Sequence, residues 1–367
     1  MVIIMMKRVI MQLPDHVQKL PAYVPGESVE SLAARLGRKP ESIIKLDANE
    51  NNYGTPPAVH RALAELTYTH RYPDAEQREL RTALSNYTGV PADFLVAGNG
   101  SDELLSLISQ ILLEPGDSVL VCPPTFSMYA FYAQLKNCNV VNVPRRANFS
   151  VNINKIIAAI RAHSPKVLYL DTPGNPTGIN VSIEDIARLL SLPILIVLDE
   201  AYLEFTEARS LITEVPDRQN LVVLRTFSKW AGLAGFRVGY GAFPKWLGDA
   251  LWQAKSPYNV TMPAMTAAVA ALNDAEVLKS NIARVVADRD RLADDLRKFT
   301  GFKVHPSGTN FLLVKVESAF GKSAAEICDA LKEQGILVRL FESMDCLRIT
   351  IGRTDEIESL LQALSEL

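Results

Sequence analysis

The sequence has few cysteines and histidines and no clusters of either. Of its 367 residues only four are cysteines, at positions 122, 138, 328 and 346, and they form no CxxC pair. The five histidines are scattered, without the spacing typical of metal ligands. The sequence therefore predicts neither a disulfide framework nor a metal centre. We interpret the cysteines as reduced, mostly buried thiols of a cytoplasmic protein.

Long apolar runs and an excess of one charge are also missing. No window approaches the ~18 apolar residues of a membrane span. The apolar residues 1–6 are too short for a signal-peptide core, and the basic residues follow them instead of preceding them. A formal net charge of −3 gives no reason to expect nucleic acid or a membrane surface as partner. With 48% hydrophobic and 22% charged residues, the composition is that of a globular enzyme.

Short apolar runs alternate with helix-like segments between about residues 94 and 242. The runs are at 94–97, 118–122, 140–143, 167–170, 194–199, 221–224 and 238–243. Continuous apolar strands separated by helices indicate an α/β fold, with a mostly parallel central sheet covered by helices. Residues 101–113 should form one of these helices, because apolar side chains recur on one side and Ser101 or Asp102 can cap its start.

The end of the chain has a different pattern. Residues 261–300 look mainly helical, and then come short strands at 302–305, 311–314 and 347–350 and helices at 323–334 and 354–366. This mixture predicts a second, smaller α+β domain. We therefore expect an N-terminal arm over 1–42, a large domain over 43–260 and a small C-terminal domain over 261–367.

Two residues at the ends of predicted strands carry the most chemical information. Lys229 follows the run at 221–224, and Asp199 ends the run at 194–199. In open α/β sheets ligands bind beyond the carboxyl ends of the strands, so the amine and the carboxylate should lie close together. A lysine that forms an imine and an acid that keeps a pyridine nitrogen protonated are what pyridoxal phosphate requires. Taken alone, Asp199 could equally be a turn residue.

A phosphate site is predicted between the strand at 94–97 and the helix after it. Gly100 permits a tight turn, and the free N–H groups of Gly100, Ser101 and Asp102 would point out of the helix start. Ser228 and Arg237 could add a hydroxyl and a guanidinium to the same phosphate. Each feature has an ordinary alternative, since such turns often carry glycine and serine, and Arg237 could be a surface arginine.

Three further residues could contact the cofactor ring. Asn175, in an Asn-Pro-Thr-Gly sequence, could donate to a ring oxygen, and the hydroxyl of Tyr202 could reach the same ring. Phe126 is a candidate to stack on the ring. Singly, Asn175 is typical of an Asn-Pro turn and Phe126 of a core aromatic. Their combined type, order and spacing favour the cofactor.

The chain resembles the fold-type-I pyridoxal-phosphate aminotransferases and, within them, the histidinol-phosphate aminotransferase subgroup. The matching pieces cover nearly the whole chain. They lie at 46–51, 71–74, 98–103, 123–126, 175–178, 199–202, 225–240, 256–260, 309–311 and 347–350. Two departures are Asn52, where the family often has proline, and Phe126, where it often has tyrosine. The turn at 172–174 also differs from the usual Asn-Pro-Asn type.

The resemblance implies a role for each matched residue. The implied catalytic set is Lys229, Asp199 and Tyr202. The implied cofactor contacts also include Gly100, Ser101, Asp102, Phe126, Asn175, Ser228 and Arg237, with Tyr72 reaching a phosphate across a homodimer interface. The implied substrate side is lined by Tyr23, Asn49, Arg339 and Arg348, of which Arg348 would bind the α-carboxylate.

The implied activity is a ping-pong transamination between histidinol phosphate with 2-oxoglutarate and imidazole acetol phosphate with glutamate. An aromatic or broad-specificity aminotransferase and a threonine-phosphate decarboxylase share the motifs and stay open as alternatives. A transcription regulator that carries this domain as an effector sensor is disfavoured. The segment before residue 43 is too short for a DNA-binding domain, and no basic stripe is present.

Overall fold

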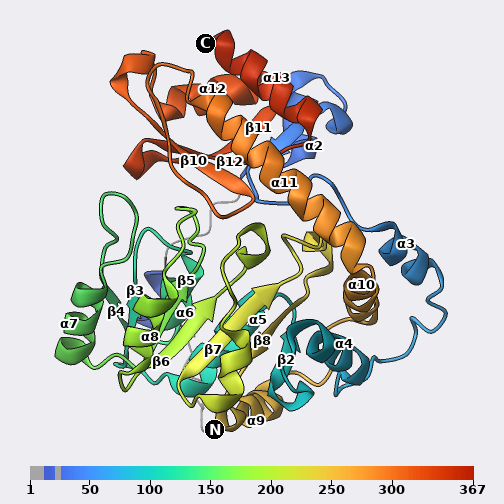
Figure 1. Cartoon of the computed structure of the whole chain (residues 1–367), viewed down its shortest axis with the longest axis vertical. Coiled ribbons are helices and arrows are strands. Elements are labelled where there is room, and N and C mark those ends of the chain that lie inside the picture. The colour runs from blue at the N-terminus through green and yellow to red at the C-terminus, as the bar shows by residue number, and fades with distance from the viewer. Residues whose placement is uncertain (1–11, 21–25) are drawn as a thin grey trace, which may run out of the picture.

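Two β-sheets organise the protein, whose computed structural model describes residues 12–20 and 26–367 (Figure 1). One sheet has seven strands in the order β2-β8-β7-β6-β5-β3-β4, and the other has five in the order β1-β11-β12-β10-β9. The strands are β1 (Ile44–Leu46), β2 (Leu95–Gly98), β3 (Ser118–Val121), β4 (Asn139–Asn142), β5 (Val167–Asp171), β6 (Leu195–Asp199), β7 (Leu221–Thr226), β8 (Gly239–Ala242), β9 (Phe302–Val304), β10 (Phe311–Val316), β11 (Ile336–Phe341) and β12 (Cys346–Thr350).

The helices of the described residues surround these sheets. They are α1 (Asp15–Gln18), α2 (Val29–Leu36), α3 (Pro57–Ala64), α4 (Arg78–Thr88), α5 (Ser101–Leu112), α6 (Met128–Leu135), α7 (Ile153–His163), α8 (Ile183–Leu190), α9 (Lys245–Ala254), α10 (Met262–Asn273), α11 (Ala275–Leu296), α12 (Ala324–Glu333) and α13 (Thr354–Ser365). No helix in this part of the chain is long and apolar enough to cross a membrane.

The central strands of the seven-stranded sheet are apolar throughout because both faces are covered. Alternate residues of each strand enter different cores, as the period of two dictates. Ile196 and Leu198 of β6 lie in a core with α7, α8 and α10, whereas Val197 lies in a core with α5, α6 and α9. Every residue of β5, β6 and β7 is buried. The prediction of a mostly parallel sheet covered by helices is confirmed, with β8 as the antiparallel exception.

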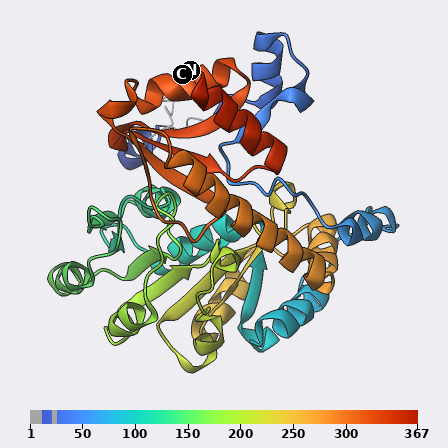
Figure 2. The same cartoon turned by 45° about the horizontal axis from the view of Figure 1, so that its top comes forward.

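The second sheet lies above the first in Figure 1, and the long helix α11 runs between them, as its orange ribbon shows in Figure 2. α11 contacts β9 and β10 of this sheet and also α10 beside the first. Two strands depart from the sequence-based expectation. β11 was not expected, and β1, which falls within the range 43–260 expected for the large domain, pairs in parallel with β11 of the second sheet. The domain boundaries at 43 and 261 stay a prediction.

The strand directions bring four strand ends to one edge of the large sheet. β5, β6 and β7 are parallel, and β8 is antiparallel to both β7 and β2, so β2 shares their direction. Their carboxyl ends are Gly98, Asp171, Asp199 and Thr226. Polar residues that follow these four positions therefore lie near one another, at the edge that Figure 1 shows facing the second sheet.

Candidate active site

A turn suited to an anion connects β2 to α5. Gly100 precedes the helix with a φ of 76°, and no side chain caps the first N–H groups. A Cβ atom at Gly100 would lie 2.7 Å from Nη2 of Arg237, and one at Gly239 would overlap the backbone nitrogen of Ser101. Glycine is required at both positions because the backbones and the guanidinium approach so closely. The uncapped helix start and Arg237 together form a site that favours negative charge.

Arg237 contacts two of the other predicted phosphate-site residues beside this turn. Its Nη1 lies 3.4 Å from the Ser228 hydroxyl oxygen, and its Nη2 lies 3.3 Å from a carboxylate oxygen of Asp102. Arg237 itself has a left-handed backbone, with a φ of 52°. The structure thus brings Gly100, Ser101, Asp102, Ser228 and Arg237 together.

Lys229 follows β7 and points toward the second sheet. Its Nζ donates a hydrogen bond to the Ala48 carbonyl oxygen at 3.2 Å and lies 6.0 Å from the centre of the Tyr202 ring. Burial, with a smaller contribution from the positive charge of Arg348, lowers the pKa of Lys229 to about 8. About a tenth of this amine is therefore unprotonated at pH 7, far more than for an ordinary lysine, and the unprotonated form is the one that acts as a base or nucleophile.

Asp199 ends β6 and is almost completely buried. Its Oδ1 accepts a hydrogen bond from the Ala201 N–H at 3.0 Å, and its Oδ2 accepts one from the Tyr129 hydroxyl at 2.7 Å. Burial raises the pKa of Asp199 to about 7, against the effect of the Tyr129 hydrogen bond. No basic side chain of the described residues pairs with this carboxylate, so it lacks a cationic partner of its own within 12–20 and 26–367.

Tyr202 and Asn49 link the two sheets beside Lys229. Asn49 donates through Nδ2 to the Tyr202 hydroxyl oxygen at 2.9 Å, and its backbone N–H donates to the Thr350 hydroxyl oxygen at 2.9 Å. Asn49 is buried and has a φ of 55°, a conformation that asparagine tolerates better than most residues. Burial raises the pKa of Tyr202 to about 12, so its hydroxyl stays protonated.

Arg348 lies at the boundary of the two sheets, on β12. Its Nη1 donates to Asn175 Oδ1 at 2.8 Å and its Nη2 to the Asp47 carbonyl oxygen at 2.7 Å, while its buried Nε has no partner among the described residues. Arg339 of β11 is directly opposite in the antiparallel register. The side chains of Arg339 and Arg348 thus branch from paired positions on adjacent strands, and Asn175 orients the guanidinium of Arg348.

The remaining predicted site residues are placed less centrally. Phe126 meets the Tyr129 ring edge-on, with 5.5 Å between ring centroids. Tyr72 is 78% exposed and stacks against Tyr258, with the centroids 4.4 Å apart. Tyr23 lies outside the described residues.

Sequence reasoning missed Tyr129 and the buried pair Arg145–Asp171. Arg145 Nη2 bonds Asp171 Oδ1, and Asp171 Oδ2 accepts from the Asn175 N–H at 2.8 Å. A signal existed for Asp171, because it ends an apolar run just as Asp199 does. None existed for Tyr129, since a tyrosine within an apolar helix is typical of a core.

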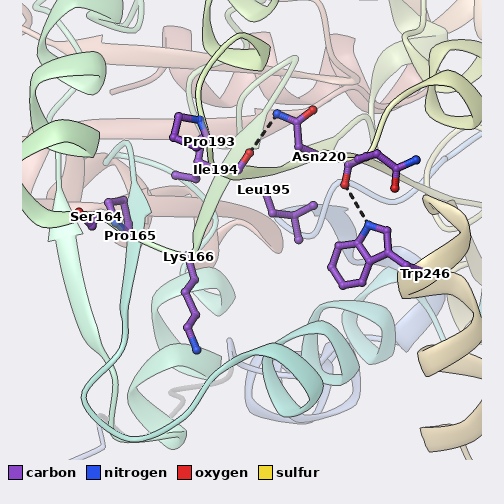
Figure 3. A pocket seen from close by; sticks show the side chains of 9 residues that line it. Ser164, Pro165, Lys166, Pro193, Ile194, Leu195, Asn220 and Trp246 are labelled. Carbon is purple, nitrogen blue, oxygen red and sulfur yellow. Dashed lines mark hydrogen bonds between the residues drawn. The ribbon is translucent and has the colours of Figure 1, made fainter.

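A separate cavity of about 410 Å³ lies at the opposite ends of the same strands (Figure 3). Lys166, Leu195 and Asn220 line it at the amino ends of β5, β6 and β7, beside Trp246. Trp246 Nε1 donates to the Gln219 carbonyl oxygen at 3.0 Å. The described part of the chain contains no group of three His, Cys, Asp or Glu side chains that could hold a metal ion.

A family model described as aminotransferase class I and II matches residues 41–364. The chain belongs to this family. It is 46% identical over 361 residues to a histidinol-phosphate aminotransferase of Roseiflexus castenholzii, covering 96% of this chain and 97% of the relative. It is 43% identical over 352 residues to the chloroplastic histidinol-phosphate aminotransferase of Nicotiana tabacum, covering 95% and 85%. The family expected from the sequence is thus confirmed.

A solved structure extends this similarity to three dimensions. Histidinol-phosphate aminotransferase of Sinorhizobium meliloti, determined in complex with pyridoxal-5'-phosphate, superposes with a TM-score of 0.87 at 29% identity. The superposition covers 98% of each chain. The chain therefore shares its overall fold with a solved aminotransferase structure that contains pyridoxal-5'-phosphate.

Proposed function

We propose that the chain is a pyridoxal-phosphate-dependent aminotransferase that interconverts histidinol phosphate and 2-oxoglutarate with imidazole acetol phosphate and glutamate. The observation that carries this proposal is the placement of Lys229, with its lowered pKa, at the same sheet edge as Asp199 and the anion-binding turn. The names of the curated relatives support the substrates. Transfer by a ping-pong sequence requires one site to accept both substrate pairs in turn.

The residues at this edge fit pyridoxal phosphate chemically. The cofactor, when bound, supplies an aldehyde for an amine and a protonated pyridine ring that withdraws electrons from the substrate Cα. Gly100, Ser101, Ser228 and Arg237 would hold its phosphate, since a Cβ would fill the space over the turn and a guanidinium already faces it. The buried, cation-free carboxylate of Asp199 suits a positively charged ring nitrogen. Phe126 would stack on the ring.

Ring-oxygen contacts are assigned to Asn175 and Tyr202. Tyr202 keeps its proton and can donate, and its hydroxyl oxygen is fixed by Asn49. Asn175 is fixed by Arg348 through Oδ1 and by Asp171 through its N–H, which leaves its Nδ2 as a donor. Both side chains are therefore oriented before any ligand arrives, which reduces the reorganisation needed at the site.

Lys229 would act as the base that removes the substrate Cα proton and later returns one to the cofactor. An ordinary lysine, with a pKa of about 10.5, is almost completely protonated at neutral pH and is a poor base. Burial lowers the pKa of Lys229 to about 8, and the neighbouring charge of Arg348 acts in the same direction. Substrate carboxylate bound at Arg348 would satisfy the unpaired Nε.

The two substrate pairs differ in their anionic group, carboxylate in one and phosphate in the other. Arg348 and Arg339 start from opposite positions on β12 and β11, and a guanidinium suits either anion. We assign Tyr23 and Arg339 to the substrate phosphate and Arg348 to the carboxylate. Asn49 would line the same side, next to Tyr202.

We further propose a cytoplasmic homodimer with shared sites. Tyr72 is exposed and its ring stacks on Tyr258, which leaves the phenol accessible to a second chain. The free cysteines of the described residues agree with a reducing compartment. Tyr72→Phe should weaken cofactor binding without changing the fold, because only one hydroxyl is lost.

The proposed activity is tested by replacing Lys229. Purified Lys229→Ala should lose transamination of 2-oxoglutarate by histidinol phosphate while still binding the cofactor through the phosphate turn. Lys39→Ala is the control, because Lys39 is exposed and is not one of the proposed site residues. Full activity of Lys229→Ala would contradict the assignment of the base.

A further inference from the structure

Tyr129 occupies a position that packing alone does not explain. It lies on α6, is 1% exposed, and places its hydroxyl 2.7 Å from Oδ2 of Asp199. Its ring stacks on Tyr169 of β5, with centroids 5.4 Å apart and planes inclined by 4°. The Tyr169 hydroxyl in turn lies 3.0 Å from the Ser109 hydroxyl on α5. Three elements thus fix the direction in which the Tyr129 hydroxyl points.

Asp199 accepts only two hydrogen bonds from the described residues. The Ala201 N–H holds Oδ1 and the Tyr129 hydroxyl holds Oδ2, so one donor on each oxygen fixes the plane of the carboxylate. The other ionisable groups around it are Asp171 on β5, Asp102 at the start of α5, and Tyr202. Both carboxylates repel its charge, and the Tyr202 hydroxyl oxygen accepts a hydrogen bond from Asn49 Nδ2 and makes none with Asp199. Tyr129 is therefore the one side chain in the described ranges that donates to Asp199.

We propose that Tyr129 is a positioning residue that keeps Asp199 ionised and oriented, so that the proton shared by Asp199 and the cofactor's pyridine nitrogen stays on the nitrogen. The proposal rests on the proposed function, in which Asp199 faces that nitrogen. A hydrogen bond donated to a carboxylate stabilises its charged form and lowers its affinity for a proton. Without the Tyr129 hydroxyl, the proton would move from the nitrogen to Asp199, and both groups would become neutral.

The chemical consequence follows from where the proton lies. A neutral ring withdraws fewer electrons from the substrate Cα, so Lys229 would remove the Cα proton more slowly. The nitrogen of Lys229, conjugated with the same ring, would hold its own proton to higher pH. Substrate affinity would change little, because Tyr129 contacts Asp199 and two aromatic rings, and Arg348 is oriented by other residues.

The chain offers a matched pair of variants. Tyr129→Phe removes the hydroxyl on Asp199 and retains both aromatic contacts. Tyr169→Phe removes a hydroxyl of the same buried stack that bonds Ser109 and does not reach Asp199. The absorbance of the bound cofactor is titrated against pH for wild type and both variants, and kcat and KM are measured with histidinol phosphate and 2-oxoglutarate.

We expect Tyr129→Phe to raise the midpoint of the absorbance titration and to lower kcat on the order of tenfold with KM nearly unchanged. Tyr169→Phe should match the wild type in both. Equal titration of Tyr129→Phe and wild type would overturn the proposal, and so would an equal shift in Tyr169→Phe, which would assign the effect to packing. If replacing Lys229 leaves the absorbance of the bound cofactor unchanged, the proposed function itself fails, and this inference fails with it.

A second variant covers the case in which Tyr129→Phe does not fold. Fluorinated tyrosine incorporated at position 129 keeps the shape and makes the hydroxyl a stronger donor. The titration midpoint should then fall below that of the wild type. A midpoint that stays unchanged or rises would contradict the role of the hydroxyl.

Discussion

Replacing Lys229 by methionine should stabilise the cofactor-free protein at neutral pH. The pKa of about 8 lies about 2.5 below the ordinary 10.5, which corresponds to about 3 kcal/mol lost by holding the charged amine in the folded chain. Methionine has a similar length and no charge to bury. The free energy of unfolding should therefore rise by up to about 3 kcal/mol at pH 7.

The gain in stability expected for Lys229→Met depends on pH. Because folding lowers the pKa of Lys229, the cost is complete below about pH 8 and fades as pH rises toward 10.5, where the unfolded chain also loses the proton. The advantage of Lys229→Met should shrink over the same range. Urea unfolding at fixed protein concentration, at pH 7 and pH 10, measures the difference.

Lys39→Met is the control for this experiment. Lys39 is exposed, so its replacement should change the free energy of unfolding by less than about 0.5 kcal/mol at both pH values. A Lys229→Met protein that is no more stable than wild type at pH 7, or whose gain is equal at pH 10, would refute the reasoning from burial.

Three further predictions concern the same site. Because folding raises the pKa of Asp199, the cofactor-free wild type should lose up to about 4 kcal/mol of stability as pH rises from about 4 to about 7. Asp199→Asn should abolish this loss. Parallel thermal unfolding profiles of the two proteins across that range would contradict the prediction. Gly239→Ala should weaken pyridoxal phosphate binding at least about tenfold in a spectrophotometric titration, because the added methyl group overlaps the Ser101 nitrogen. Gly235→Ala, with open space around it, should bind the cofactor normally. Equal affinities of the two variants would argue against the turn at Gly100 as the phosphate site. Arg348→Lys should raise the KM for glutamate about a hundredfold, since an ammonium cannot replace the guanidinium fork that Asn175 orients. An unchanged KM would remove Arg348 from the carboxylate site.

The large sheet could be predicted from the sequence because its strands are buried on both faces. The apolar run 194–199 corresponds to β6 (Leu195–Asp199), and the helix expected at 101–113 corresponds to α5 (Ser101–Leu112). β11 (Ile336–Phe341) was missed, since Arg339 interrupts its apolar run. The pairing of β1 with β11 joins residues almost 300 positions apart, and local periodicity carries no information on such a contact.

The candidate site was predictable where a residue type is chemically unusual at its position. A lysine and an acid after apolar strands, and glycines around a turn, indicate a cofactor from sequence alone. Tyr129 and Arg145 gave no such signal, because their roles depend on which helix or loop packs beside Asp199 and Asp171. The role proposed for Tyr72 requires a second chain, so it cannot be read from the geometry of one chain.

The most direct test of the proposed function is a half-reaction with single substrates. Purified protein loaded with pyridoxal phosphate is mixed separately with histidinol phosphate, glutamate, phenylalanine and threonine phosphate, and the absorbance of the bound cofactor is followed. We predict fast, lasting loss of the resting absorbance with histidinol phosphate and with glutamate, and slow or no change with phenylalanine. Comparable loss with phenylalanine would contradict the substrate assignment in favour of an aromatic or broad aminotransferase. Carbon dioxide release from threonine phosphate without lasting absorbance loss would contradict transamination itself.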